Sequence, residues 1–211
     1  MKIIQLVVGM VSTNCYIVYD EKTLDGGVID PGDDSDEILE KITEENVNIK
    51  FILLTHGHFD HIMAASDICE KTGGKIVVHK NDVGYLKECV VNGFSSYIKT
   101  KYDELMPDIL AEDGTIIDVS GISFEYIHTP GHTPGSCIIK AENYLFTGDT
   151  LFKKSCGRCD LAGGNFSKIL CSLKRISNIS GDYNVLPGHG EKTTLQEEKK
   201  YNPYMLQDVE K

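Results

Sequence analysis

The sequence predicts an α/β fold in which two β-sheets pack face to face with helices on their outer sides. Three observations lead to this prediction. Short β-branched and apolar runs alternate with helical patterns early in the chain. A second set of strands and helices follows a weakly patterned middle segment. Strands in both halves end in glycine-rich turns that carry His or Asp, so we expect a site at one sheet edge.

In the first half, the patterns predict a helix at residues 35–45 and strands at residues 2–8, 14–19, 27–30, 50–54 and 75–79. A further helix is ended by glycines 73–74 and has these residues on one face: Ile62, Ala65, Ile68 and Cys69. Residues 81–107 are weakly patterned polar helix or loop.

In the second half, we expect strands at residues 122–127, 137–140, 144–146 and 183–186, a helix at residues 167–176 and a capped final helix at residues 193–200. No low-complexity linker interrupts the pattern, so we expect one domain over residues 1–211.

Composition excludes several classes of function. The chain has 21 Lys and Arg against 32 Asp and Glu, a net charge of −11, and no basic stripe, which argues against a nucleic-acid partner. The apolar first residues lack a signal-peptide cleavage site, and no run approaches the roughly 20 residues of a membrane helix. Seven scattered cysteines are typical of reduced thiols. We expect a cytoplasmic protein with no membrane partner; its oligomeric state is left open.

Four potential metal ligands follow the apolar run at residues 51–54, namely His56, His58, Asp60 and His61. Imidazole and carboxylate suit Zn²⁺ and similar divalent ions, and the uneven spacing lets different members face different ions. A polar surface loop with chance histidines is the alternative. It is disfavoured because three of the chain's seven histidines lie within these six residues.

Three further candidates, His132, Asp149 and His189, lie in glycine-rich turns after later strands. Taken singly, each has an ordinary alternative as a capping Asp or an exposed loop His. Together with the first cluster, they indicate one shared metal site.

The motifs resemble the metallo-β-lactamase superfamily and, within it, the short glyoxalase II-like (hydroxyacylglutathione hydrolase-like) hydrolases. They are H-x-H-x-D-H at 56–61, G-H-T-P-G at 131–135, F-T-G-D at 146–149 and P-G-H-G at 187–190. The resemblance implies a four-layer αββα sandwich with two mixed sheets face to face and helices outside. It also implies two metal ions, one held by His56, His58 and His132, the other by Asp60, His61 and His189, with Asp149 bridging both.

This ligand set implies hydrolysis of a small acyl thioester. Two divalent ions, with Zn²⁺ expected and Fe or Mn also suitable, lower the pKa of a shared water. Asp60 and Asp149 would position the resulting metal-bridging hydroxide for attack on the acyl carbon. A thiolate is a good leaving group, since its conjugate acid has a pKa of about 8.5. Only 22 residues follow His189, whereas full-length glyoxalase II carries a C-terminal extension that helps bind glutathione, so the thiol is left open.

The segment after Asp149 resembles the G-R-x-D element of glyoxalase II-like and persulfide dioxygenase enzymes. Arg158 could anchor a substrate carboxylate, although pairing with Asp160 is the favoured role. Cys156 and Cys159 form a C-x-x-C that permits a redox pair or an extra soft-metal site, but coincidence is favoured because no second C-x-x-C exists to complete a Cys₄ site. We expect Lys153 and Lys154 to be solvated.

Three residues outside the ligand set are also assigned. Asp30 matches a family position that supports a metal-binding His, with an ordinary Asp-Pro turn as the alternative. His79 and His128 end apolar strands outside the motifs, and we expect packed or surface side chains there.

The main alternative function is a mononuclear iron persulfide dioxygenase with His56, His132 and Asp149 as ligands. The P-G-H-G form around His189 favours the second metal of the hydrolases instead. A non-catalytic scaffold is disfavoured because no ligand is missing, and a diiron flavoprotein because position 58 is His rather than Glu.

Overall fold

The first of two large sheets has the strand order β1-β2-β3-β4-β5-β6 in a computed structural model that describes residues 1–87 and 105–207. Strands β1 to β3 are antiparallel, and β3 to β6 are parallel. The sheet is therefore mixed. In order, its strands are Lys2–Val8, Thr13–Tyr19, Asp25–Ile29, Asn48–Leu53, Lys75–His79 and Ile109–Ala111.

The second sheet has the order β14-β13-β10-β9-β8-β7 and is also mixed, because β10 and β13 run parallel. A small hairpin, β11 (Leu151–Phe152) with β12 (Ser155–Cys156), follows β10. The strands β7, β8, β9, β10, β13 and β14 are Ile116–Val119, Ile122–His128, Cys137–Ala141, Tyr144–Gly148, Asn184–Pro187 and Thr193–Thr194.

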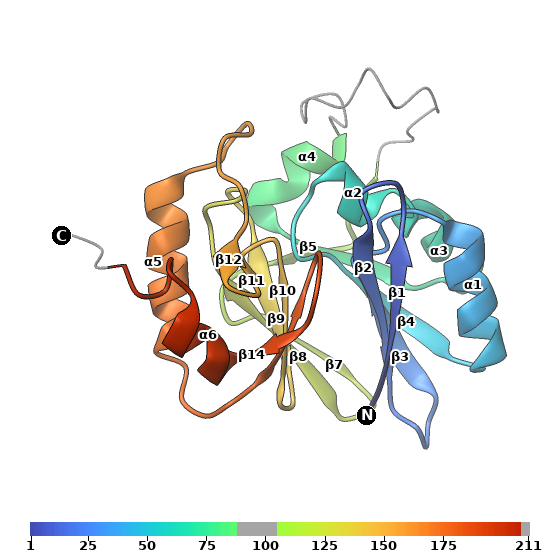
Figure 1. The fold of residues 1–211 in the computed structure, drawn as a ribbon. Coiled ribbons are helices and arrows are strands. Elements are labelled where there is room, and N and C mark those ends of the chain that lie inside the picture. Colours follow the sequence, from blue (N-terminus) through green and yellow to red (C-terminus); the bar gives the residue numbers. More distant parts are fainter. Residues whose placement is uncertain (88–104, 208–211) are drawn as a thin grey trace.

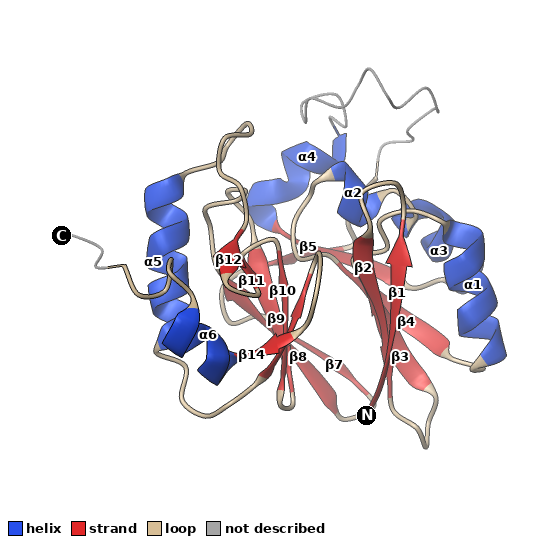
Figure 2. Ribbon diagram, viewed as in Figure 1, coloured by secondary structure: helices blue, strands red, loops and turns tan. Residues whose placement is uncertain are grey.

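Helices cover the outer faces of both sheets (Figure 1). Helices α1 (Ser35–Glu44) and α3 (Ala65–Thr72) lie on the first sheet, and α5 (Phe166–Ser177) and α6 (Leu195–Tyr201) on the second. Figure 2 shows the two strand layers between the helices. The predicted αββα sandwich is confirmed. The short α2 (Phe59–Ile62), η1 (Lys80–Asp82) and α4 (Val83–Lys87) lie in connections of the first half.

Strand β2 shows how the sequence builds these layers. All seven of its residues are buried, and successive side chains point to opposite faces. Cys15 and Ile17 belong to the core that α1 and α3 cover, whereas Tyr16 and Val18 belong to the core between the sheets. A third core under α5 and α6 includes Leu173. A strand buried on both faces is mostly apolar rather than alternating, as β2 is after its first two residues.

The predicted helix around residues 62–69 is wrong in one respect, because it is split into α2 and α3. The Ala64 N–H donates to the Pro31 carbonyl at 3.0 Å instead of continuing the helical ladder. The final helix also starts later than predicted, since residues 193–194 form β14 and Thr194 caps α6 by accepting from the Glu197 N–H.

Four short strands, β6, β7, β11 and β12, were not predicted, because two to four residues carry too little periodicity. The weakly patterned segment 81–107 falls partly outside the described residues. Its described start forms η1 and α4. Among the described residues, no helix is long and apolar enough to cross a membrane.

Candidate metal centre

The seven predicted ligands lie on loops that leave the two sheets, and the fold brings them together. Because β3 and β4 are parallel, as are β10 and β13, each pair presents its carboxyl ends at one edge. The loop after β4 carries His56 and His58, and α2 carries Asp60 and His61. The remaining three, His132, Asp149 and His189, follow β8, β10 and β13.

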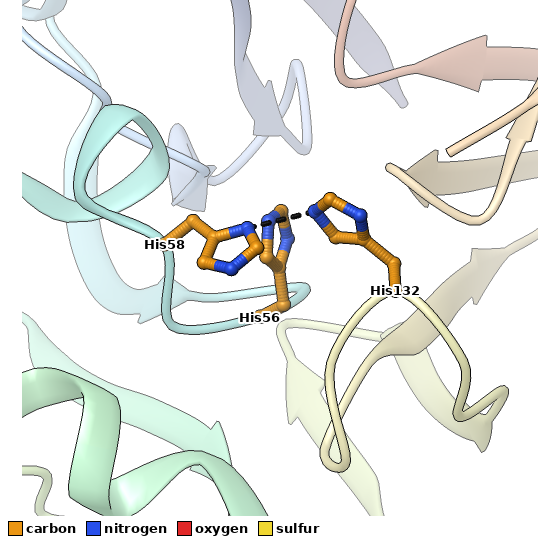
Figure 3. Close-up of side chains that lie close together, drawn as sticks. All are labelled: His56, His58 and His132. Atoms are coloured by element: carbon orange, nitrogen blue, oxygen red, sulfur yellow. Dashed lines mark hydrogen bonds between the residues drawn. The ribbon is translucent and has the colours of Figure 1, made fainter. Parts of the chain in front are cut away.

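The ligand atoms form two neighbouring groups, each compact enough to hold one ion. Within each group, they lie within 4.8 Å of one another. Figure 3 shows the three rings of the first group turned toward one another from two loops. The first group is His56, His58 and His132, and the second is Asp60, His61 and His189. Two nitrogens in the first group, His58 Nδ1 and His132 Nε2, are 2.7 Å apart.

Asp149 connects the two groups through its separate carboxylate oxygens. Its Oδ2 lies 3.5 Å from His132 Nε2 in the first group. Its Oδ1 lies 3.4 Å from His61 Nε2 and 3.6 Å from His189 Nε2 in the second. Asp149 therefore lies between the two groups of predicted ligands.

Four of the five histidines have their Nδ1 atoms beside oxygens. Carbonyl and carboxylate oxygens only accept, so a neutral ring bonded to one carries its proton on Nδ1 and leaves the Nε2 lone pair free. The Thr55 hydroxyl donates to Asp30 and can therefore accept from His56. The four pairs are His56 with Thr55 Oγ1 at 3.1 Å, His61 with Asp30 Oδ2 at 3.0 Å, His132 with the Arg158 carbonyl at 2.7 Å and His189 with the Ser12 carbonyl at 3.3 Å.

Unsatisfied buried atoms show that the site fits a cation. Among the described residues, His56 Nε2, His58 Nε2 and Asp149 Oδ1 are buried without a hydrogen-bond partner. A buried polar atom without a partner costs about 1–3 kcal/mol, so such atoms in one cluster are suited to binding a cation. Lone pairs from neutral imidazoles and an ionised carboxylate make a donor set that suits a divalent metal.

The electrostatics favour the same protonation states in the first group. Burial, followed by the charge on His132, lowers the pKa of His58 to about 3. Burial also lowers the pKa of His56. Burial alone would raise the pKa of Asp149, but the surrounding histidines outweigh it and hold that pKa well below its usual value. Neutral rings thus face an ionised bridge.

The second group has more carboxylates around its histidines than the first. Burial would lower the pKa of His61, but the carboxylates of Asp60, Asp149 and Asp30 outweigh it and raise the pKa well above its usual value. A cation entering this group would therefore displace protons as it binds.

Asp30 contacts the second group through His61, on the side of the ring away from the other ligand atoms of that group. It follows β3 with a φ of 49°, a left-handed conformation that is uncommon for a residue with a side chain. Its Oδ2 accepts from the Thr55 hydroxyl at 2.6 Å and lies 3.0 Å from His61 Nδ1. These contacts orient the Thr55 hydroxyl, which lies beside His56, and the ring of His61. A simple Asp-Pro turn would leave the carboxylate in solvent.

Asp82 is a positioning candidate that the sequence analysis missed. Its fully buried carboxylate accepts from the Gly57 N–H at 3.0 Å, the Gly135 N–H at 2.6 Å and the Thr133 hydroxyl at 2.6 Å. It joins the loop of His56 and His58 to the loop of His132. A Cβ on Gly135 would lie 2.6 Å from this carboxylate, so glycine is required there. Asp82 lies in a weakly patterned segment of the sequence. The signal that could have pointed to it is the pair of glycines on its partner loops, Gly57 and Gly135, which leave room for its close contact with both backbones.

The other predicted residues lie around the centre. Arg158 pairs with Asp160, as favoured, through two hydrogen bonds of 2.7 Å. Lys153 and Lys154 are exposed, although the first pairs with Glu191. Cys156 and Cys159 are half-buried free thiols.

His79 and His128 stack on each other between the two sheets, with ring centroids 4.1 Å apart. The expectation of packed rings is confirmed for His79, which is buried.

A pocket of about 450 Å³ opens over both groups, within the roughly 300–1,000 Å³ typical of small-molecule sites. Five of the seven candidates line it, namely His58, Asp60, His132, Asp149 and His189. The site can therefore admit a small substrate directly above the ligand atoms.

Residues 8–198 match the family model of the metallo-beta-lactamase superfamily. The chain belongs to this superfamily. Its members include metal-dependent hydrolases, and the His- and Asp-rich centre described above lies within the matched region.

Curated superfamily relatives match nearly the whole chain. Hydroxyacylglutathione hydrolase GloC from Haemophilus influenzae is 32% identical over 91% of this chain and 92% of its own. The probable metallo-hydrolase YqgX from Bacillus subtilis is 32% identical, covering 97% and 98%. The probable polyketide biosynthesis zinc-dependent hydrolase BaeB from Bacillus velezensis is 31% identical, covering 87% and 76%.

Solved superfamily structures share the fold. The BLEG-1 B3 metallo-beta-lactamase has a TM-score of 0.90 and 31% identity, covering 98% of this chain and 100% of its own. TTHA1623 in a di-iron-bound form has a TM-score of 0.83 and 30% identity, covering 95% and 99%. ETHE1 from Myxococcus xanthus has a TM-score of 0.80 and 29% identity, covering 96% and 84%.

Proposed function

We propose that this metallo-β-lactamase superfamily member is a binuclear hydrolase of a small acyl thioester, similar to glyoxalase II. The observation that carries the proposal is Asp149, whose two oxygens face the two groups of ligand atoms separately. The likeness to hydroxyacylglutathione hydrolase GloC supports a thioester as the substrate.

In this proposal, His56, His58 and His132 hold one divalent ion, Asp60, His61 and His189 hold the other, and Asp149 contacts both. Asp30 keeps the His61 ring in place through Nδ1. Zinc is the first candidate, supported by the zinc-dependent BaeB, and the di-iron form of TTHA1623 supports iron as an alternative. Manganese also suits these ligands.

The bound ions would supply Lewis acidity toward the thioester carbonyl and would lower the pKa of a water. Asp60 Oδ2 and Asp149 Oδ1 both lie near His189 Nε2, at 3.2 Å and 3.6 Å, and both residues line the pocket, so the two carboxylates lie close together at the substrate site. There they can accept hydrogen bonds from the attacking water and orient it toward the acyl carbon. The thiolate can leave without a general acid, since its conjugate acid has a pKa of about 8.5.

The deciding experiment combines elemental analysis of protein purified from its own host with a thioester screen and an oxygen electrode. We expect about two metal ions per chain and thioester turnover without oxygen consumption. One iron per chain, with oxygen consumed in the presence of a persulfide, would overturn the proposal.

The second candidate function is a mononuclear iron persulfide dioxygenase, which would hold one iron per chain and consume oxygen. It is favoured by the sequence resemblance around Arg158 and by the short distance from His132 to Asp149, since His56, His132 and Asp149 would be its three ligands. The proximity of His189 to Asp60 and Asp149 supports the binuclear hydrolase instead.

Two further expectations accompany the proposal. The cysteine pattern predicts a cytoplasmic protein, and one domain is predicted over residues 1–211. Both remain predictions.

A further inference from the structure

The pocket above the candidate metal centre has a wall that the proposed hydrolysis does not use. Besides the ligand residues, it is lined by apolar side chains from four separate loops or short elements. Each of them is partly exposed. These residues are Val11, Phe59, Phe152 and Leu161.

Apart from the histidines and the metal ions that they would hold, the described residues that line this pocket offer no unpaired cationic side chain. Arg158 is the one Lys or Arg in the lining, and its Nε and Nη2 bind the two oxygens of Asp160 at 2.7 Å each. This bidentate pair uses the geometry with which Arg would otherwise hold a substrate carboxylate. The chain's net charge of −11 further disfavours an anionic substrate approaching from solvent.

We propose that this pocket selects thioesters whose body beyond the reacting group is an uncharged apolar chain, in preference to carboxylate-bearing thiols such as glutathione. This inference rests on the proposed function and names its substrate class. The thioester group lies at the centre, and the apolar chain lies against Phe59, Phe152 and Leu161.

The apolar chain could belong to the acyl side or to the thiol side, and the experiment separates them. The holoenzyme is assayed with N-acetylcysteamine thioesters from acetyl to octanoyl, and with acetyl thioesters of alkanethiols of increasing length. We expect kcat/KM to rise about fourfold for each methylene that becomes buried, on the side that occupies the wall. The glutathione thioester of the same acyl group should be the poorer substrate.

Matched variants test whether these residues cause the selectivity. Leu161→Ser and Phe152→Ser should flatten the dependence on chain length. The control Leu110→Ser changes an exposed leucine on β6 that does not line the pocket, and it should keep the dependence. Asp160→Ala frees Arg158 and should raise the rate with a glutaryl thioester relative to the hexanoyl thioester severalfold.

Binding measurements keep the inference testable apart from hydrolysis. Non-hydrolysable S-alkyl-N-acetylcysteamines and S-alkylglutathiones of equal chain length are titrated calorimetrically into the same holoenzyme. Affinity that rises with chain length and is weaker for the glutathione series supports the inference, even if no thioester is cleaved, which would remove only the proposed function. Cleavage of acetyl thioesters combined with no chain-length dependence in rate or affinity overturns the inference and leaves the hydrolase standing.

Discussion

The hydroxyl of Thr133, the residue after the candidate ligand His132, donates a 2.6 Å hydrogen bond to the buried carboxylate of Asp82. The same carboxylate accepts from the Gly57 N–H, between His56 and His58. One side chain therefore sets the distance between the two loops that supply the first metal group. Burial raises the pKa of Asp82, although these hydrogen bonds oppose that effect.

Replacing Asp82 by Ala should loosen the first metal group. The change leaves three buried donors without their acceptor, and we expect the free energy of unfolding to fall by about 3 kcal/mol. Metal affinity should fall by about 10- to 100-fold, as for other residues that orient ligands. Urea unfolding of the metal-free protein and competition with a chromophoric chelator measure the two effects.

Asp82→Asn is the matched control, because it keeps one acceptor oxygen in the same place. It should lose less of both quantities. Metal affinity equal to wild type in Asp82→Ala would show that the two loops hold their spacing without this carboxylate.

Replacing His189 by Ala should empty or weaken the second metal position only. His189 Nε2 lies 3.2 Å from Asp60 Oδ2 and is one of three donors in its group. We expect the metal content to fall from about two ions per chain toward one, with thioesterase activity reduced at least 100-fold. Elemental analysis and initial rates check this, with the exposed Lys192→Ala on the same loop as control. Unchanged metal content and rate would refute the binuclear assignment.

The stacked pair of His79 and His128 predicts a pH-dependent stability. Burial, followed by the charge of His128, lowers the pKa of His79 to about 4. Lys80 lowers this pKa too, whereas Glu112 and Asp113 oppose the shift. The unfolded chain takes up this proton near pH 6.5 and the folded chain only near pH 4. The free energy of unfolding therefore falls as the pH drops from about 6.5 to 4 and is not changed further by this group below that range.

The contribution of His79 is about 2 kcal/mol after allowing for solvent screening. Urea unfolding of the metal-free protein at pH 7 and pH 4 measures the total loss for wild type and for His79→Phe. The variant should lose about 2 kcal/mol less than wild type over this interval. An identical loss in both proteins would mean that His79 does not titrate in this range.

Cys156 and Cys159 should not control turnover. Burial, followed by the charge of Cys159, raises the pKa of Cys156 to about 11, and burial also raises the pKa of Cys159. Because the thiolate is the reactive form, little of it exists at neutral pH. We expect equal initial rates with and without a thiol reductant. A rate that falls under a mild disulfide oxidant and recovers with reductant would contradict this prediction.

The amino-acid sequence alone predicts the residue types of the centre and most of the strands and helices that carry them. Side-chain periodicity placed the longer strands and helix α5 within a residue or two, since these patterns are local. His56, His58, Asp60 and His61 lie so close together in the chain that they share a site in any fold that orders this loop.

How the two groups of predicted ligands face each other depends on the tertiary structure. Asp149 Oδ1 lies beside the rings of His61 and His189, which are 88 positions earlier and 40 positions later in the chain, and its Oδ2 lies beside His132. Asp82 reaches Gly57 and Gly135 across the boundary between two sheets, and Arg158 is engaged by Asp160 rather than free. Such contacts depend on strand register and on the packing of the sheets, which no local pattern of residues encodes.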